Sequence, residues 1–496
     1  MEQRNYQRAA TTDYELPELQ SYIAGRMETP ALASGRFLLN PNSLDSLQEQ
    51  LASSEEQVAA ALSVADNAHQ NGEWENTPAV IRADVLDSIA DTLADQKVAE
   101  TIAYVDAITT GAVIDVTRGM ARLASLSFRA TAQYLREGKL DQLLPGKAGD
   151  IDYFRRPWGP ALLVSPWNAP TAIGSHKIAS ALAAGAPCIA KPSEWAPHSA
   201  ILMAAAIHSQ GLPTGTFQLI CGSRITGGLM VGDPRIKAVS FTGGTAGGRA
   251  ISRACADNFV PMQLELGGNN PMVVFADADL DKAAKGILYG LTNLNAQWCR
   301  ALGRVIVHRS VKEALLEKVS EGFAKVVLGD SLDPLSTMGP QIHQQQYRAI
   351  LSEIDRLQSL GGKVIQNTRM PDLPGYFIPP TLIDGCSADD TREEIFGPVA
   401  TVHDFDTDAE ALQLANGTDY GLAAYVYSEH KDSAFDFSRK LRTGGVKING
   451  YNLLSLTPDA PRGAWGLSGL GEEGTSHTVE FFTGARVVGP APDPRP

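Results

Sequence analysis

The chain has 496 residues, of which 44% are hydrophobic and 20% are charged, and its formal net charge is −14. These proportions exclude a disordered chain and a long coiled coil, and the length indicates about two to four domains. The acidic balance argues against nucleic acid and against an anionic membrane surface as partners.

The five cysteines stand at positions 188, 221, 255, 299 and 386 without a CxxC pair, which argues against a disulfide framework and a thiolate zinc site. The nine histidines lack metal-ligand spacing, so we expect no metal. Neither an apolar leader nor an apolar run of about 18 residues occurs, so we expect no signal peptide and no membrane helix. Together these features predict a cytoplasmic protein.

The chain divides into segments of different periodicity. Residues 43–135 place acidic and apolar residues at helical spacing and are expected to be mostly helical. Residues 137–156 contain a Pro-Gly turn between two short runs and are interpreted as a hairpin. From residue 160 short apolar runs alternate with helical segments, and the alternation restarts after residue 270. This pattern predicts two α/β units with parallel sheets.

Within these two units the strands and helices can be placed individually. The predicted strands are 161–167, 186–192, 216–222, 236–244, 270–276 and 303–309, and the predicted helices are 171–185, 197–210, 278–291 and 311–323. The usual dinucleotide fingerprint GxGxxG, the P-loop and the hydrolase elbow GxSxG are all missing. The sequence therefore lacks the common short signatures of cofactor and nucleophile sites.

Three segments contain residues that are unusual in positions that serve only to stabilise a fold. Cys299 follows a predicted helix in a polar setting beside Arg300, and this is the one cysteine with an evident reason to ionise. An isolated cysteine is more often a small buried hydrophobe, which is how we interpret Cys188 and Cys221. Cys299 is therefore a candidate nucleophile.

Glu265 ends a predicted strand directly before a Gly-Gly-Asn-Asn turn. The carboxyl ends of parallel strands border the crevices of open α/β sheets, so Glu265 could be a general base instead of a solvated strand carboxylate. Asn168 lies between two prolines at a strand-to-helix junction. It could cap the helix, or its amide could donate to an oxyanion.

Taken together, these segments resemble the NAD(P)-dependent aldehyde dehydrogenase superfamily over roughly residues 35–490. The resemblance is carried by eight motifs in order along the chain. They are Pro166-Trp167-Asn168, Lys191-Pro192-Ser193-Glu194, Phe241-Thr242-Gly243, Leu264-Glu265-Leu266-Gly267-Gly268-Asn269-Asn270-Pro271, Gln297-Trp298-Cys299, Glu394-Ile395-Phe396-Gly397-Pro398-Val399, Tyr420-Gly421-Leu422-Ala423 and Ser468-Gly469.

The resemblance implies oxidation of an aldehyde to an acid through a covalent thioester. Cys299 would attack the carbonyl, the Asn168 amide and the backbone N–H of Cys299 would hold the oxyanion, and Glu265 would activate water for hydrolysis. A secondary proton route would run through Lys177 and Glu473, for which a simple surface charge is the alternative.

The cofactor implied by the resemblance is NAD, with NADP as the alternative. Lys191 and Glu194 match positions that contact the adenosine ribose, and a carboxylate at Glu194 repels the 2′-phosphate of NADP. Glu394 matches the nicotinamide-ribose contact, and Phe396 matches a residue beside the nicotinamide. The remaining cofactor-binding candidates are Ser165, Pro166, Trp167, Ser193, Phe241, Thr242, Gly243, Gly244, Leu266 and Gly267.

The chain departs from the family pattern at three places. Gly244 replaces the usual serine, Ala296 replaces the glycine before Gln297, and Arg462 corresponds to an aromatic residue that commonly lines the substrate tunnel. Arg462, with Ala169, Ala172, Ile173 and His176 on the opposite wall where large apolar residues are common, favours a roomier and more polar tunnel for a bulky or anionic aldehyde, unless Arg462 faces solvent. The expected substrate contacts are Ala169, Ala172, Ile173, His176, Trp298, Arg300 and Arg462.

The expected fold class is α/β, aldehyde dehydrogenase-like. A Rossmann-type NAD-binding domain would take residues 1–136 and 157–265, a second α/β catalytic domain would take 266–465, and a small β oligomerisation element would take 137–156 and 466–496. We expect a homodimer or homotetramer, because the tail has a strand-like run that needs a partner edge.

Two alternative functions remain open on the same fold. One is a CoA-acylating semialdehyde dehydrogenase, against which Glu265 argues because such enzymes typically lack the carboxylate that activates water. The other is a catalytically silent binding or structural protein, against which the joint presence of Cys299, Glu265 and Asn168 argues.

Overall fold

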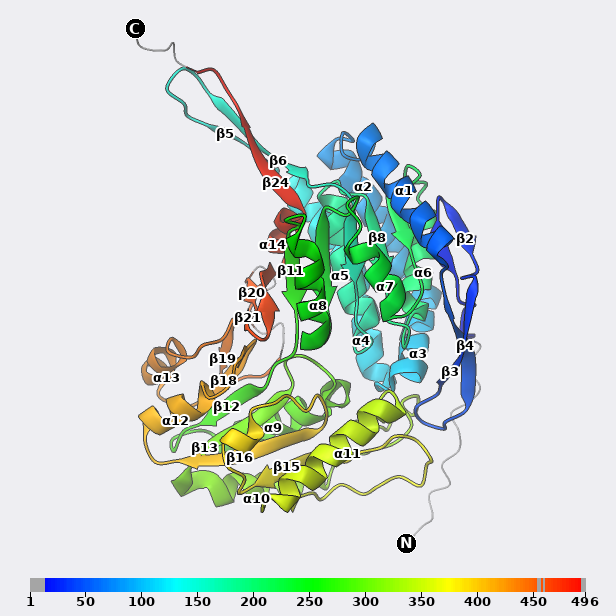
Figure 1. Ribbon diagram of the computed structural model, residues 1–496. Helices are drawn as coiled ribbons and strands as arrows, with labels where there is room; N and C mark the ends of the chain where they lie inside the picture. The colour runs from blue at the N-terminus through cyan, green and yellow to red at the C-terminus, as the bar shows by residue number, and fades with distance from the viewer. Residues whose placement is uncertain (1–13, 453–455, 458–459, 492–496) are drawn as a thin grey trace.

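Two β-sheets with helices packed on them form most of the molecule (Figure 1). The computed structural model describes residues 14–452, 456–457 and 460–491. The first sheet has eight strands, and its central strands run parallel. In spatial order they are β2 (Arg26–Glu28), β1 (Ser21–Ile23), β9 (Phe217–Leu219), β8 (Cys188–Lys191), β7 (Ala161–Val164), β10 (Ala238–Thr242), β11 (Met262–Glu265) and β22 (Gly469–Leu470).

The second sheet has seven strands and lies below the first in Figure 1. In spatial order they are β14 (Lys363–Ile365), β15 (Thr381–Asp384), β16 (Val399–Phe405), β13 (Leu302–His308), β12 (Asn270–Val274), β18 (Ala424–Tyr427) and β19 (Val446–Ile448). Only β14 is antiparallel to its neighbour. The two α/β units with parallel sheets are therefore confirmed.

Helices connect these strands. Those between strands of the first sheet are α5 (Pro170–Ala183), α6 (His198–His208), α7 (Arg224–Val231) and α8 (Thr245–Ala256). Those of the second unit are α9 (Leu280–Thr292), α10 (Lys312–Phe323), α11 (Gln344–Ser359), α12 (Asp408–Ala415) and α13 (Lys431–Ser438). The four predicted helices correspond to α5, α6, α9 and α10. None of the described helices is long and apolar enough to cross a bilayer.

Residues 43–135, which the periodicity predicts to be mostly helical, contain four helices and one strand. The helices are α1 (Glu55–Asn71), α2 (Ala79–Ala94), α3 (Gln96–Thr110) and α4 (Ile114–Arg136). The expectation of helix from residue 43 is wrong over β4 (Ser46–Ala52), which pairs with β3 (Leu32–Leu39). The first helix can begin only at its cap, since Ser54 accepts a hydrogen bond from the backbone of Gln57 in a capping box.

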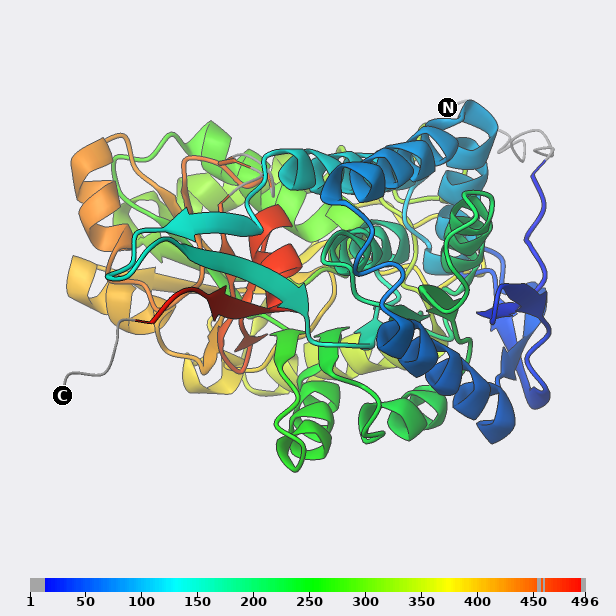
Figure 2. The same ribbon diagram turned by 90° about the horizontal axis from the view of Figure 1, so that it is seen from above.

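A three-stranded arm projects from the body, as Figures 1 and 2 show from two directions. The predicted hairpin is confirmed as β5 (Asp141–Leu144) and β6 (Ile151–Pro157). β24 (Thr483–Val488) pairs with β6 over its whole length, so the strand-like run of the tail forms hydrogen bonds with a strand of its own chain. Just before it, α14 (Thr475–Phe481) packs against α5 and α4.

The largest hydrophobic core lies between the helices α2 to α6 and the first sheet. Leu86, Phe128 and Ala179 are completely buried in it. Because α5 is buried along most of its length, the residues at its N-terminus are held rigidly against the end of β7. This junction carries Asn168.

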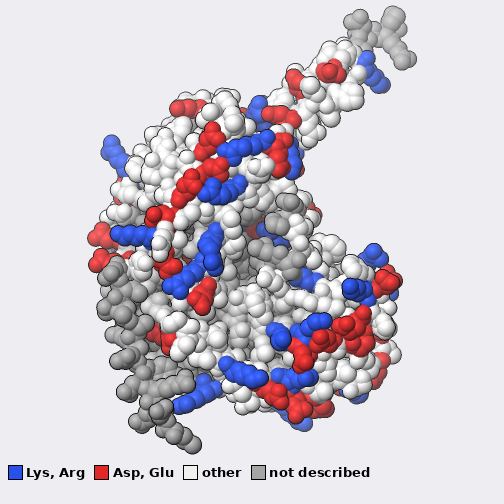
Figure 3. Space-filling view, turned by 180° about the vertical axis from the view of Figure 1, so that it is seen from behind, with Lys and Arg blue, Asp and Glu red and all other residues white. Residues whose placement is uncertain are grey.

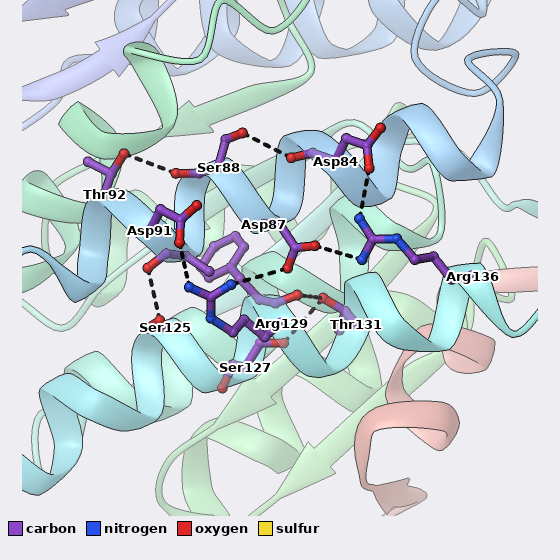
Figure 4. Close-up of polar contacts among 12 residues, drawn as sticks. Asp84, Asp87, Ser88, Asp91, Thr92, Ser125, Ser127, Arg129, Thr131 and Arg136 are labelled. Carbon is purple, nitrogen blue, oxygen red and sulfur yellow. Dashed lines mark hydrogen bonds and ion pairs between the residues drawn. The ribbon is translucent and has the colours of Figure 1, made fainter.

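Basic and acidic side chains alternate on the surface, as Figure 3 shows for one face. A row of ion pairs links α2 to α4 (Figure 4). Asp87 lies at its centre, 2.6 Å from Arg136 and 3.6 Å from Arg129, and the outer partners are Asp84 and Asp91. Solvent reaches most of these side chains, so each pair contributes little.

We predict that Asp87→Asn lowers the free energy of unfolding by about 0.5–1 kcal/mol in low salt, because it weakens two ion pairs at once. Denaturant titration at low ionic strength and in 1 M NaCl measures the effect. The loss should shrink in high salt, where surface charges are screened. An equal loss at both salt concentrations would contradict this electrostatic origin.

Candidate active site

The three candidate catalytic residues come from different elements that meet at the carboxyl ends of the first sheet's strands. Asn168 follows β7, Glu265 is the last residue of β11, and Cys299 lies between α9 and β13. Asn168 and Glu265 are 8% and 5% exposed, and Cys299 is half-buried. The thiol is thus the more accessible group, as a nucleophile needs.

A strained turn precedes Cys299. Leu294, Asn295 and Ala296 have φ angles of 49°, 55° and 58°, in the left-handed region where a side chain costs about 1 kcal/mol per residue. The Asn295 side chain fixes the turn, because its amide donates to the carbonyls of Gly111 and Pro340 at 2.8 Å each. Ala296, where the family usually has glycine, therefore adopts a backbone conformation that glycine prefers.

Three buried side chains hold the backbone on either side of the nucleophile. The Asn270 amide donates to the carbonyls of Cys299 and Ala301 at 2.9 and 2.7 Å. The hydroxyls of Tyr425 and Tyr451 donate to the carbonyl of Arg300 at 2.8 and 3.1 Å. Asn270 is part of a family motif but has no predicted role of its own, and neither tyrosine was predicted, because both stand far along the chain and carry no local signal.

Arg300 links the thiol and the carboxylate electrostatically. Its guanidinium lies 3.4 Å from Glu265 Oε1, and both side chains are buried. Burial, and then the charge of Glu473, raises the pKa of Glu265, while Arg300 opposes the rise. Burial and the Glu265 charge raise the pKa of Cys299 well above its usual value, and Arg300 again lowers it. Glu265 Oε2 has no hydrogen-bond partner, so it can accept a proton.

Lys177 and Glu473 are not surface charges. Lys177 is completely buried, lies 3.6 Å from Glu473 Oε1, and donates to Ser240 Oγ at 2.7 Å. Ser240 in turn donates to Gln263 Oε1 at 2.8 Å. Burial alone would raise the pKa of Glu473, but Lys177 and the neighbouring cations lower it, so we take the carboxyl as ionised. A buried chain of polar groups therefore lies beside the site.

Arg462 lies in the same charged cluster, with 23% of its side chain exposed. It belongs to β20 (Arg462–Gly463), which pairs with β23 (Glu472–Glu473). Its guanidinium is 3.9 Å from Glu473 Oε2. The charges of Glu473 and Arg462 both act on His176, whose pKa burial lowers to about 4, so this imidazole is neutral at pH 7.

The other substrate candidates form an apolar wall. Trp298 is 5% exposed and belongs to the hydrophobic cluster that contains Ala169, with Ile173 packed against it. Its ring lies 5.9 Å from that of Tyr451. Ala172, on the first turn of α5, is half-buried. Trp298 thus forms part of the packing behind the nucleophile.

The cofactor candidates lie along the carboxyl ends of β7, β8 and β10. Lys191 is 4% exposed, and its Nζ is 3.8 Å from Glu194 Oε2. Thr242 Oγ1 is buried without a partner, and Gly244, the N-cap of α8, has no side chain that could accept from the helix N–H groups. Unsatisfied donors at a helix N-terminus suit a phosphate. Ser165, Pro166, Ser193, Phe241 and Gly243 belong to the same strand ends and the loops that follow them.

Glu394 lies across from this group, on the second unit. It accepts a hydrogen bond from the Gly268 N–H at 2.8 Å, and burial raises its pKa to about 8. A Cβ at Gly267 would lie 2.0 Å from Glu394 Oε2, so only glycine allows this approach. Phe396 packs edge-on against Trp167 at 5.3 Å, and Leu266 is buried beside α8. The residues of the two α/β units together present polar groups and an aromatic surface to a dinucleotide, which fits the expected cofactor.

Arg300→Met is predicted to slow alkylation of Cys299 by iodoacetamide several-fold at neutral pH and to raise the pKa of that reaction, because the guanidinium stabilises the thiolate. The measurement is the alkylation rate against pH, read by mass spectrometry of the Cys299 peptide. Arg300→Lys keeps the charge and should retain most of the rate. An unchanged pKa in Arg300→Met would contradict the role of Arg300.

The buried carboxyl group of Asp106, below the site, is expected to make the stability of the fold depend on pH. It is 3% exposed and accepts from Thr171 Oγ1 at 2.6 Å, next to Asn168 at the start of α5. Burial raises its pKa to about 7. Since this is above the unfolded value of about 3.9, the native state holds the proton more tightly, and stability falls as the pH rises from about 4 to about 7.

Asp106→Asn removes this ionisation and should raise the free energy of unfolding at pH 8 by about 2–4 kcal/mol, with little effect at pH 4. Urea unfolding of both proteins across this pH range tests the prediction. Asp115→Asn, an exposed substitution on α4, should leave the pH dependence unchanged. A variant no more stable than the parent at pH 8 would show that Asp106 is not the group responsible.

Similar proteins agree with this arrangement. Residues 36–488 match the pattern described as the aldehyde dehydrogenase family. Aldehyde dehydrogenase 1 of Tanacetum cinerariifolium is 32% identical over 96% of this chain and 95% of its own length. Aminoaldehyde dehydrogenase 1 of Malus domestica is 33% identical over 92% of this chain and 93% of its own.

Solved structures show the same fold. Betaine aldehyde dehydrogenase from Staphylococcus aureus in complex with NAD⁺ has a TM-score of 0.89 and 30% sequence identity, and the match covers 95% of this chain and 94% of that one. The match spans both sheets and the residues of the site. The chain belongs to the aldehyde dehydrogenase family.

Proposed function

We propose that the protein oxidises an aldehyde to its carboxylic acid with NAD, through a thioester on Cys299. One observation carries this proposal: the half-buried Cys299 thiol interacts with Glu265, a buried carboxylate with one unpartnered oxygen. This pairs a nucleophile with a base. Membership of the aldehyde dehydrogenase family defines the reaction class.

The reaction begins with attack of Cys299 Sγ on the carbonyl carbon. The thiol proton passes to Glu265, because burial raises the pKa of this carboxyl and thereby makes it a stronger base. The oxyanion receives hydrogen bonds from the Asn168 amide and the backbone N–H of Cys299. Arg300 compensates the negative charge that builds up between Cys299 and Glu265.

Bound NAD accepts the hydride that leaves the carbonyl carbon. The carbon then remains on Cys299 as a thioester. Before hydrolysis Glu265 releases the proton that it took from the thiol, for which the Lys177–Glu473 pair offers a secondary route. Glu265 then removes a proton from water as the water attacks the thioester carbon. The C–S bond breaks, and this second proton passes to the departing Cys299 sulfur, which gives the acid and the free thiol.

Two observations support NAD. The Staphylococcus aureus neighbour was solved with NAD⁺ bound. In this chain the Glu194 carboxylate lies 3.8 Å from Lys191, where it would accept from a ribose hydroxyl and repel a 2′-phosphate. NADP remains the alternative cofactor, which side-by-side kinetics with both dinucleotides distinguishes.

We also propose which segments of the chain carry out each function. Residues 1–136 and 157–265 bind NAD, residues 266–465 carry the nucleophile, and 137–156 with 466–496 join subunits into a homodimer or homotetramer. The exposed apolar side chains of the arm support the last assignment, with Leu143 at 69% and Val487 at 65% exposure. Light scattering of the purified protein determines the oligomeric state.

Glu265→Gln is expected to release NADH once per site and then stop, because water is no longer activated, and to lower kcat on the order of 100-fold. Cys299→Ala should release none. Stopped-flow NADH absorbance with a simple aldehyde, with and without CoA, measures both. Full activity in Cys299→Ala would contradict the proposal, and NADH formation that strictly requires CoA would favour the acylating alternative.

A further inference from the structure

A pocket next to the nucleophile is lined by three basic side chains. They are Arg300, Lys447 and Arg462, and we call this pocket the cationic recess. Its other described lining residues are small or uncharged, and none of them is acidic: Gly444, Gly445, Val446, Leu456, Thr457, Ala460 and Pro461. Arg300 joins the recess to Cys299 directly along the backbone.

Lys447 is the unusual member of this set. It stands on β19 and is 8% exposed, and its ammonium has neither an ion pair nor a hydrogen bond with any described residue. Its ammonium lies 5.7 Å from the centre of the Tyr425 ring, a contact that compensates only part of the lost hydration. A buried ammonium without an anion is unfavourable, so the position favours a negative ligand.

The two arginines do not remove this excess of positive charge. Arg300 pairs with Glu265 and donates to the Leu422 carbonyl at 3.2 Å, which engages part of its five N–H donors. Arg462 meets Glu473 only at 3.9 Å. Among the described residues, two carboxylates therefore neutralise these three cations, and one of them, Glu473, also pairs with Lys177. Burial, followed by the charges of Arg300 and Arg462, lowers the pKa of Lys447 to about 8, so an added anion would keep the amine protonated.

We infer that the cationic recess binds a carboxylate carried by the aldehyde substrate, so that Lys447 makes the enzyme selective for anionic aldehydes. This inference rests on the proposed function, because the recess selects substrate only if Cys299 reacts with it. The carboxylate would lie between Lys447 and the free donors of both arginines while the aldehyde carbon reaches Cys299.

The recess predicts poor use of a cationic aldehyde. Betaine aldehyde carries a quaternary ammonium group, which three basic side chains would repel. Lys447 and Arg462, both on segments that follow β18, would act with Arg300 in this discrimination.

Selectivity is measured as the ratio of kcat/KM for 4-oxobutanoate to kcat/KM for pentanal, with betaine aldehyde as the cationic probe. We expect a ratio of about ten or more in the parent protein and poor use of betaine aldehyde. Lys447→Met should lower the ratio about tenfold, mainly through KM for the anion. Lys447→Arg keeps the charge and should preserve the preference, and Lys440→Met removes an exposed lysine as the matched control.

A second readout does not depend on turnover. Glutarate should protect Cys299 of the parent protein from iodoacetamide, and the protection should disappear in Lys447→Met, with circular dichroism confirming that the variant is folded. A ratio near one in the parent, or equal ratios and equal protection in Lys447→Met, would overturn the inference while leaving the proposed function intact. If no aldehyde is oxidised but glutarate still protects, the proposed function fails and the carboxylate site stands.

Discussion

The side chain of Asn270 holds together the parts on which the site depends. Its amide nitrogen donates to the carbonyls of Cys299 and Ala301, and its oxygen accepts from the Ala423 N–H at 3.0 Å. One buried residue of β12 thereby joins the nucleophile's loop to the segment that enters β18. The left-handed residues before Cys299 are tolerated because such hydrogen bonds fix the loop from both sides.

The chemistry follows from charge buried at this fixed loop. Glu265, Arg300 and Lys177 are buried, and the Glu473 side chain is only 13% exposed. Attraction and repulsion between charges are stronger in such surroundings than in water. The acidic balance of the chain is compatible with this arrangement, since the positive charge is supplied locally by buried side chains and a helix N-terminus. Arg300 is central, because it lies between the thiol, the base and the cationic recess.

The sequence predicted the architecture well, because strands and helices leave local signals. Alternating strands and helices predicted two parallel sheets, and Glu265 could be placed at a strand end by its position before a glycine turn. The strand over Ser46–Ala52 was missed because its partner β3 is a separate run that its own periodicity does not reveal.

The residues that hold the site in place could not be predicted, because their contacts join segments that are far apart in the sequence. Tyr425 and Tyr451 reach Arg300 across 125 and 151 positions of sequence, and Lys447 is unusual only because nothing acidic among the described residues faces it. Arg462 was identified by its departure from the family pattern, but its pairing with Glu473 depends on the register of two short strands. Such contacts are properties of the folded chain.

The central claim is that the substrate carbon passes through a thioester on Cys299 that Glu265 hydrolyses. The direct test is peptide mass spectrometry of Glu265→Gln, quenched in acid after mixing with NAD and an aldehyde. The account predicts that the Cys299 peptide gains the mass of the acyl group and loses it again on treatment with hydroxylamine. An unmodified Cys299 peptide at a time when NADH has formed would contradict it.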